Sequence, residues 1–237
     1  MSAESPPTAR SDRPVTLVGG APTTREILDR ALSRAPVPMA ADGGAEALLS
    51  RGIVPERVFG DLDSLSAEAI DRLGDRAVRI HDQDTTDLQK CLALIDAPLI
   101  LGVGFLGGRL DHTLSSLGTL MGQGDRPVVL LGEADVAMHL AGAVTLDLPP
   151  GARVSLMPLA PVRIRSEGLR WKTGALTLAP GGRDGCSNEA TGPVTLNPAG
   201  PGTILVLDSS MLDPLLAGDG PGAPSRFAEP KQPRKGA

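Results

Sequence analysis

The spacing of apolar residues changes once along this chain, near residues 134–142. From Pro14 to about residue 133, short apolar runs such as VTLVGG and PLILGVGF alternate with segments whose apolar residues recur at helical spacing. After residue 140, runs such as VTLDL, RVSLMPL and TILVLD are separated only by turns that contain Gly or Pro. Strands separated by helices need crossover connections and form a mostly parallel sheet, whereas strands joined by turns form sandwiches or barrels.

Two domains fit a chain of 237 residues, since each is large enough to bury its own core. We expect a Rossmann-like α/β domain with a mostly parallel sheet over residues 14–138 and an all-β sandwich domain over residues 139–215. The two ends, residues 1–13 and 216–237, are rich in Pro, Gly, Ser and charged residues. This composition buries too little apolar surface to offset the entropy lost on ordering, so we expect two disordered tails.

Charge and cysteine usage exclude several classes of function. The net charge is -5 and no long basic run occurs, which argues against sequence-independent nucleic-acid binding. Cys91 and Cys186 lie far apart without metal-ligand spacing, and no apolar N-terminal segment resembles a signal peptide or a membrane span. We therefore expect a reduced, cytoplasmic protein that acts on a small molecule, with neither nucleic acid nor membrane as a partner.

Four unusual clusters each follow a predicted strand. They are ADGGA (Asp42, Gly43, Gly44), GDLDS (Asp61, Asp63), HDQDTTD (Asp82, Asp84, Asp87) and GFLGGRLDH (Gly107, Gly108, Arg109, Asp111, His112). The carboxyl ends of parallel strands meet at one edge of a sheet, and ligands bind there in α/β folds. The sequence therefore predicts that all four clusters converge on one site.

Taken singly, the acidic clusters have simpler explanations as helix caps. Ser66 and its neighbours precede one predicted helix, and Thr86 to Gln89 has the spacing of a capping box. Together, however, the six carboxylates of the first three clusters would repel one another at one edge unless a cation lay among them. Asp61 and Asp63 would face the same side of an extended segment. Oxygen ligands without Cys or clustered His indicate Mg²⁺ or Mn²⁺, which takes further ligands from substrate phosphates.

The segment GFLGGRLDH supplies features suited to phosphate. A glycine turn before a helix lets backbone N–H groups approach an anion, and Arg109 offers a forked cation. The overlapping run GVGFLG, Gly102 to Gly107, also matches the GxGxxG dinucleotide pattern, with Glu133 as a ribose-binding acid. That interpretation leaves the other three clusters unexplained, so we favour a metal–phosphate site.

Four segments resemble thiamine pyrophosphokinases in order and spacing. They are ADGGAEALLSRGIVPERVFGDLDS, DQDTTDLQKCLAL, GFLGGRLDHTLSSL and EGLRWKTGALTLAPGGRDGCSNEA, and the resemblance runs from about Val15 to Leu207. It implies an α/β domain that binds ATP and Mg²⁺, a β-sandwich that binds thiamine, and a homodimer with active sites between the α/β domain of one subunit and the β domain of the other. The reaction would transfer pyrophosphate from ATP to the hydroxyl of thiamine, giving thiamine diphosphate and AMP.

The resemblance also implies roles for single residues. The expected Mg²⁺ ligands are Asp61, Asp63 and Asp87, with Asp42 and Gly43 supporting the same site. Gln83 would contact the thiamine pyrimidine, Trp171 would stack on thiamine, and Ser187 with Asn188 would supply polar contacts to it. Gly107, Gly108, Arg109, Asp111 and His112 belong to the nucleotide-phosphate region. Two positions depart from the family pattern, Leu62 where Phe is usual and Ser116 where many bacterial members carry Asn.

Some roles and two other functions stay open. Asp84 or Asp87 would accept the hydroxyl proton, and His112 is a third candidate that would equally serve as a helix cap or phosphate contact. Lys90 would meet a phosphate or pair with Asp87. The same carboxylates would suit a Mg²⁺-dependent hydrolase of nucleotides or phosphate esters, or a non-catalytic sensor of thiamine diphosphate or nucleotide.

Overall fold

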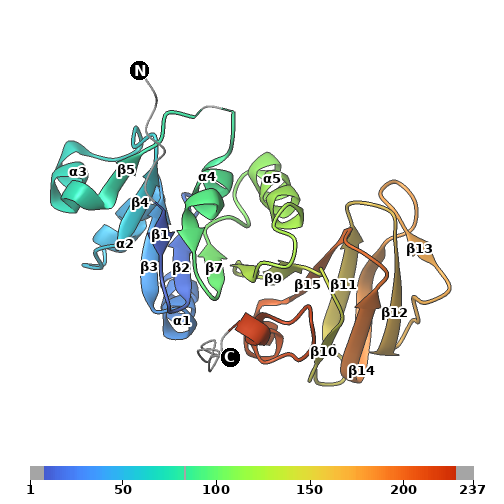
Figure 1. The fold of residues 1–237 in the computed structure, drawn as a ribbon. Helices are drawn as coiled ribbons and strands as arrows, with labels where there is room; N and C mark the ends of the chain where they lie inside the picture. The colour runs from blue at the N-terminus through green and yellow to red at the C-terminus, as the bar shows by residue number, and fades with distance from the viewer. Residues whose placement is uncertain (1–7, 83, 228–237) are drawn as a thin grey trace, which may run out of the picture.

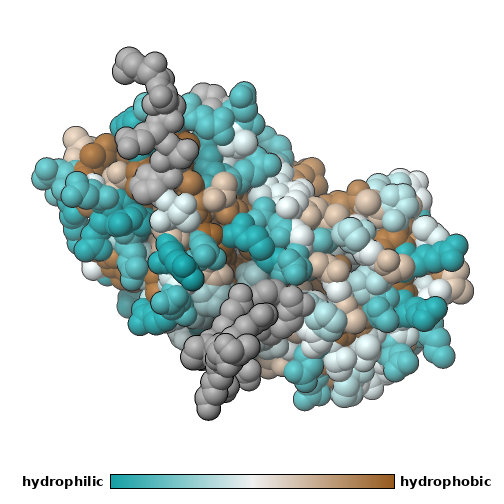
Figure 2. Space-filling view, in the orientation of Figure 1, coloured by the Kyte–Doolittle hydropathy of each residue, from teal (hydrophilic) through white to brown (hydrophobic). Residues whose placement is uncertain are grey.

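The computed structural model describes residues 8–82 and 84–227, which form two halves that lie side by side (Figure 1). Helices surround the sheet of the first half, and the second half consists mainly of strands. Figure 2 shows one face of the molecule, where hydrophilic residues predominate and apolar residues lie scattered between them. Within the described residues, no helix combines the length and the apolar character needed to cross a membrane.

The first half is built on six parallel strands in the order β8-β7-β2-β3-β4-β5. Their bounds are β2 Val15–Val18, β3 Val37–Ala41, β4 Arg57–Gly60, β5 Ala77–Arg79, β7 Ile100–Val103 and β8 Val128–Leu131. From β2 the chain adds β3, β4 and β5 on one side and β7 on the other. The strand order therefore reverses between β2 and β7, and such a switch point opens a crevice at the carboxyl ends of the strands.

Helices cover both faces of this sheet. They are α1 Arg25–Arg34, α2 Gly44–Leu49, α3 Ala67–Leu73, α4 Asp87–Leu94 and α5 Leu110–Met121, with a short 3-10 helix, η1, at Gly74–Arg76. Leu17 and Phe59 belong to one buried apolar cluster with side chains of α4 and α5, while Val18 and Val58 belong to another with side chains of α1, α2 and α3. Successive strand residues face opposite sides, which explains the two clusters.

Two of the helices begin with the caps expected from the sequence. The Ser66 hydroxyl accepts a hydrogen bond from the backbone N–H of Ala69, and Thr86 forms a capping box with Gln89. The capping interpretation is therefore confirmed at Ser66 and Thr86. The side chains that form these caps are those of Ser66, Thr86 and Gln89. Capping therefore does not explain the neighbouring carboxylates.

Strand β9, Asp135–His139, joins the two halves. It pairs antiparallel with β8 on one side and with β15, Thr203–Asp208, on the other. Strand β15 also pairs antiparallel with β11, Arg153–Pro158. One mixed sheet of 13 strands therefore runs through both halves. The expected domain boundary between residues 138 and 139 falls inside β9, which connects the two halves by backbone hydrogen bonds.

The second half follows the strand pattern that the sequence predicts. Its remaining strands are β10 Val144–Leu146, β12 Val162–Leu169, β13 Thr177–Leu178 and β14 Gly185–Pro198, and no α-helix interrupts the fully described stretch 144–208. The long strand β14 pairs with β11 near Asn188, and with β10 and β12 near Leu196. These strands are hydrogen-bonded into the sheet of the first half through β15.

Parts of the two segments expected to be disordered tails, residues 1–13 and 216–237, are paired with the rest of the fold. Strand β1, Ala9–Arg10, pairs parallel with β6, Ile95–Asp96, and buries Ala9. At the other end, after the 3-10 helix η2 (Ser209–Met211) and helix α6 (Leu212–Leu216), Asp219 exchanges two backbone hydrogen bonds with Thr145. The 3-10 helix η3, Pro224–Phe227, comes last. A few small apolar residues and backbone pairing suffice to order these segments, which composition alone does not reveal. Residues 1–7 and 228–237 lie outside the described part of the chain.

Candidate active site

A cavity of about 820 Å³ lies at the carboxyl ends of the parallel strands. Its walls come from the segments after β2, β3, β4 and β7 and from the first turns of α4 and α5. The lining residues are Gly20, Ala21, Pro22, Ala41, Asp42, Gly43, Asp61, Ser64, Thr85, Thr86, Asp87, Leu88, Lys90, Gly104, Phe105, Gly107, Gly108, Arg109, His112, Ser115 and Ser116. All four predicted clusters contribute to it. The volume lies within the range of small-molecule sites.

Three carboxylates form one group at this cavity. Oxygens of Asp42, Asp61 and Asp63 all lie within 4.8 Å of one another. Asp42 is buried, and its Oδ1 has no hydrogen-bond partner in the described structure. A buried carboxylate oxygen without a partner is unfavourable unless a cation or a donor satisfies it. The group therefore suits a hard divalent cation, and oxygen donors of this kind match Mg²⁺ or Mn²⁺.

The backbone at this group is left-handed at two residues other than glycine. Asp42 has a φ of 42° and Leu62 a φ of 63°. Leu62 points into the core, and the turn brings the backbone N–H of Asp63 to 3.3 Å from the Asp61 Oδ1. The expectation that Asp61 and Asp63 share a side because the segment is extended was wrong, since a turn at Leu62 brings them together. Such backbone conformations are uncommon for a bulky residue and cluster at functional sites.

Asp87 lies in the same cavity but outside the three-carboxylate group. It occupies the first position of α4, and its Oδ1 lies 3.3 Å from the Lys90 Nζ. The Lys90 side chain is only 6% exposed, whereas that of Asp87 is 48% exposed. Of the two roles expected for Lys90, the structure shows the ion pair with Asp87. Lys90 also lines the cavity, where a phosphate could reach it.

The loop before α4 holds the other acidic residues of that cluster. Asp82 accepts hydrogen bonds from the Thr85 hydroxyl and from the backbone N–H of Asp84. These bonds, that of Thr85 first, hold the pKa of Asp82 below its usual range. Asp84 does not line the cavity, so Asp87 is the better placed of the two proton-acceptor candidates. Gln83, expected to contact thiamine, lies outside the described residues.

The glycine turn before α5 has the predicted form. Gly107 and Gly108 are left-handed, with φ of 82° and 66°. Arg109 forms a forked ion pair with Asp111, with N–O distances of 3.1 and 2.6 Å. The Arg109 guanidinium holds the pKa of Asp111 below its usual range. Arg109 lines the cavity beside His112, but Asp111 neutralises it in this structure, so a phosphate would have to displace that carboxylate.

Backbone contact between two loops closes the cavity at the switch point. A β-carbon on Gly104, whose φ is 75°, would lie 2.6 Å from the carbonyl oxygen of Gly19. The backbone N–H of Ala21 donates to the carbonyl oxygen of Gly104, at 3.0 Å, and Gly20, Ala21, Pro22 and Phe105 all line the cavity. The sequence patterns did not lead us to assign these residues to the site. The available signal was the VTLVGG run, which ends a predicted strand in glycines just as the assigned clusters follow theirs.

The predicted residues of the second half lie away from this cavity. Among the described residues, none after Ser116 lines the cavity, so the structure of one chain does not bring Trp171, Ser187 or Asn188 to the carboxylates. Trp171 follows β12, which lies at the opposite side of the molecule from β4 (Figure 1). Trp171 is 55% exposed, and the Arg170 guanidinium carbon lies 5.1 Å from its ring centroid.

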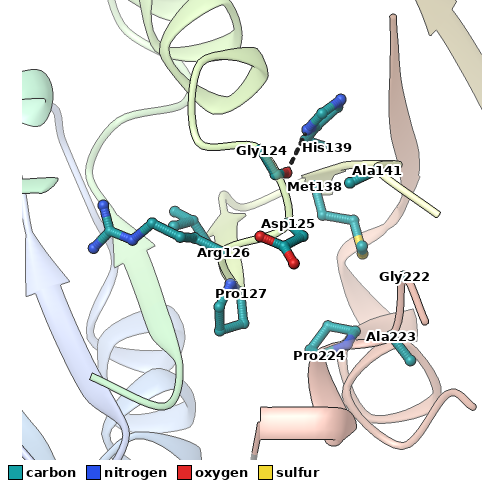
Figure 3. Close-up of a pocket in the computed structure, with 11 residues that line it drawn as sticks. Gly124, Asp125, Arg126, Pro127, Met138, His139, Ala141, Gly222, Ala223 and Pro224 are labelled. Carbon is teal, nitrogen blue, oxygen red and sulfur yellow. Dashed lines mark hydrogen bonds between the residues drawn. The ribbon is translucent and has the colours of Figure 1, made fainter. Parts of the chain in front are cut away.

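A second, much smaller cavity lies between the end of α5 and the C-terminal segment. It measures about 10 Å³ and is lined by residues that include Arg126, Met138, His139 and Pro224 (Figure 3). The His139 Nδ1 lies 2.9 Å from the carbonyl oxygen of Gly124. A space of this size holds a single water molecule at most, so it is not a substrate site.

Comparison with known proteins identifies one family consistently. The model of the family described as "Thiamin pyrophosphokinase, catalytic domain" matches residues 28–130. Thiamin pyrophosphokinase 1 of Caenorhabditis elegans is 30% identical over 173 residues, which cover 65% of this chain and 71% of that protein. Thiamine pyrophosphokinase 3 of Oryza sativa subsp. japonica is 28% identical over 194 residues, or 67% of this chain and 73% of that protein.

Solved structures share the fold over most of the chain. The thiamin pyrophosphokinase of Candida albicans superposes with a TM-score of 0.72 at 18% identity, covering 88% of this chain and 95% of that one. The thiamin pyrophosphokinase of Geobacillus thermodenitrificans superposes with a TM-score of 0.67 at 28% identity, covering 85% and 99%.

Proposed function

The chain belongs to the thiamine pyrophosphokinase family, and on that basis we propose that it transfers the diphosphate group of ATP to the hydroxyl of thiamine. The oxygen of the hydroxyl forms a bond to the β-phosphorus of ATP, and the bond from that phosphorus to the bridging oxygen of the α-phosphate breaks. The products are thiamine diphosphate and AMP. The observation that carries this proposal is the three-carboxylate group at the mouth of a cavity large enough for a nucleotide.

Asp42, Asp61 and Asp63 would hold Mg²⁺. The unpartnered Oδ1 of Asp42 is the specific sign of a missing positive charge, and the oxygen-only donor set fits Mg²⁺. When bound, the ion neutralises charge on the phosphate oxygens. The family resemblance also counts Asp87 as a ligand; we place it apart from the other three because it belongs to a different wall of the cavity.

The other residues of the cavity bind and orient the reactants. Phosphoryl transfer depends mainly on positioning and on neutralising charge. Lys90 offers a buried ammonium, and the left-handed turn at Gly107 and Gly108 brings backbone close to an anion without side chains in the way. Arg109 adds a guanidinium once a phosphate takes the place of Asp111. Asp87 accepts the proton of the thiamine hydroxyl, since it lines the cavity and Asp84 does not.

We further propose that the active protein is a homodimer with shared sites. Within the part of the chain that the structure describes, the second half adds no residue to the cavity wall, and Trp171 of that half is exposed. Leu110 and Leu114, on the α5 surface next to the cavity, are 72% and 59% exposed, which is unusual for Leu. A second copy would cover these leucines and bring its own Trp171 and Ser187 to the first copy's carboxylates.

A product assay tests this function. Purified protein is incubated with ATP, Mg²⁺ and thiamine, and AMP, ADP and thiamine diphosphate are separated by chromatography. Equal amounts of AMP and thiamine diphosphate, both lost in Asp61→Asn, are the expected result. Nucleotide cleavage that proceeds equally without thiamine would indicate a hydrolase instead, and saturable thiamine binding without any product would indicate a sensor.

A further inference from the structure

The side chain of Asn188 makes three hydrogen bonds to the backbone, two to Trp171 and one to Glu189. Its Oδ1 accepts from the backbone N–H groups of Trp171, at 3.1 Å, and Glu189, at 2.9 Å. Its Nδ2 donates to the carbonyl oxygen of Trp171, at 2.7 Å. The two bonds to Trp171 fix the orientation of the amide, because a backbone N–H only donates and a carbonyl only accepts. Asn188 is 5% exposed, and both acceptor positions of its oxygen are occupied.

This pair of hydrogen bonds replaces a missing strand partner. Strand β12 ends at Leu169, which pairs with Ala190 of β14, and the backbone N–H of Arg170 donates to the carbonyl oxygen of Glu189. At Trp171 the backbone ladder has ended, and the Asn188 side chain pairs with both the N–H and the carbonyl of that residue. The backbone of Trp171 is therefore held at the end of the sheet by one side chain.

A neighbouring ion pair covers one face of the indole ring. The Arg170 guanidinium carbon lies 5.1 Å from the ring centroid, and an Arg170 nitrogen lies 3.2 Å from a carboxylate oxygen of Glu189. A guanidinium in this position makes a favourable cation–π contact. Since Trp171 is nevertheless 55% exposed, the opposite face of the ring is available to a ligand. Two adjacent residues of β14 thus act on Trp171: Asn188 binds its backbone, and Glu189 binds the Arg170 side chain that lies over its ring.

We propose that Asn188 is a positioning residue, which presents the open face of Trp171 to a flat heteroaromatic ring of the substrate without touching the substrate. This role rests on the proposed function, in which that ring belongs to thiamine, and it replaces the direct contact expected from the sequence. Asn188 is buried, its oxygen is fully occupied, and one of its two N–H groups binds the Trp171 carbonyl, so the exposed Trp171 ring is the better placed of the two side chains to meet a ligand. The exposed Ser187, left-handed with a φ of 57°, keeps the role of polar contact.

The chain permits a direct optical test, because Trp171 is its single tryptophan and it has no tyrosine. Intrinsic fluorescence therefore reports on this one ring. The variants are Asn188→Ala and the milder Asn188→Asp, which keeps the acceptor oxygen and loses the donor to the Trp171 carbonyl. Asn197→Ala is the matched control, since Asn197 is an exposed residue of the same strand.

In the absence of ligand we expect lower Trp171 anisotropy and stronger acrylamide quenching in both Asn188 variants, and wild-type values in Asn197→Ala. In the product assay we expect the thiamine KM to rise by about tenfold, with kcat within about twofold of wild type, because binding loses its fixed platform. In a Trp171→Ala background, Asn188→Asp should change the thiamine KM no further, because the two residues act as one unit.

A rise in KM with unchanged anisotropy and quenching would overturn the proposal and restore a direct contact. Additive effects in the double variant would overturn it equally, as would Asn188 variants that match wild type in every readout. If the wild-type protein and Asn197→Ala form no thiamine diphosphate, the proposed function fails instead, and the ligand-free fluorescence still decides whether Asn188 holds Trp171.

Discussion

Gly60 lies so close to Asp42 that a β-carbon on Gly60 would come within 2.8 Å of the Asp42 β-carbon. Gly60 ends β4 and Asp42 directly follows the neighbouring parallel strand β3, and the backbone N–H of Asp42 donates to the carbonyl oxygen of Phe59, at 2.8 Å. The missing side chain at Gly60 therefore lets Asp42 approach Asp61. The geometry of the three-carboxylate group depends on this contact.

Gly60→Ala is predicted to displace Asp42 and disrupt the carboxylate group. An added methyl group must push Asp42 away, and a displacement of this kind lowers activity by about a hundredfold. Steady-state kinetics with MgATP measures the loss. Gly200→Ala is the control, because a β-carbon there meets nothing within 4 Å and the residue lies in a bend after β14. That variant should keep full activity, with its stability equal to wild type or higher by up to about 1 kcal/mol. Equal activity in the two variants would contradict this role of Gly60.

Asp42→Asn is predicted to weaken metal binding without destabilising the metal-free protein. The substitution keeps the shape of the side chain and removes a buried charge whose Oδ1 has no partner. The Mg²⁺ concentration for half-maximal activity should rise more than about tenfold, while the Tm measured with a chelator should stay level or rise. Asp84→Asn, outside the cavity, should behave as wild type. A large fall in the metal-free Tm of Asp42→Asn would mean that this carboxylate is structural.

Shared active sites predict complementation between two subunits that carry different defects. A heterodimer of Asp61→Asn and Trp171→Ala chains contains one site with every residue intact, so it should recover about half of the wild-type activity at low thiamine concentration. The heterodimer is isolated with two different affinity tags after co-expression. A heterodimer of Asp61→Asn and Asp63→Asn is the control, since each of its sites carries one defect. If the Asp61→Asn and Trp171→Ala heterodimer were no more active than half the Trp171→Ala homodimer, each site would lie within one chain.

The ion pair of Arg34 with Asp213 is predicted to stabilise the fold only above acidic pH. It links α1 to α6, with a shortest N–O distance of 2.7 Å, and the hydrogen bond and charge of Arg34 hold the pKa of Asp213 below its usual value of 3.8. A lowered pKa gives stability that is present above the unfolded value and is lost as the pH falls through the folded value. Asp213→Asn should therefore lower Tm at neutral pH and converge with wild type in acid.

Because the Arg34–Asp213 pair is about half exposed, the difference in Tm should be small and should shrink at high salt. The control is Asp29→Asn, which breaks the more exposed pair with Arg25 on the same helix. Differential scanning calorimetry from neutral pH down into acid measures both variants. A Tm difference for Asp213→Asn that is the same at every pH would exclude the ion pair as its cause.

The site could be located from the sequence because one rule of topology was sufficient. Residues that follow parallel strands meet at one edge of the sheet, and Asp42, Asp61, Asp87 and Arg109 do line one cavity. The same rule does not specify how the backbone turns after each strand. The left-handed Leu62 depends on the packing of its side chain into the core, which spacing in the sequence does not encode.

Local sequence patterns also could not predict which distant segments pair with each other. Strand β9 reads as one more apolar run, and only its pairing with β15, far later in the chain, makes it the link between the two halves. Ala9 and Asp219 lie in segments with the composition of tails, yet each is ordered by backbone pairing with a distant strand or loop. The separation of Trp171 from the carboxylates depends on how the two halves are arranged, which short sequence motifs do not specify.

The fate of the β-phosphorus of ATP tests the proposed diphosphate transfer most directly. ATP labelled at that atom is incubated with thiamine, Mg²⁺ and either the wild-type protein or Asp61→Asn, and the labelled products are separated. We predict that the label passes into thiamine diphosphate, in step with AMP, in the wild type alone. Label that remains in ADP, or that appears in free phosphate or pyrophosphate whether or not thiamine is present, would contradict the transfer.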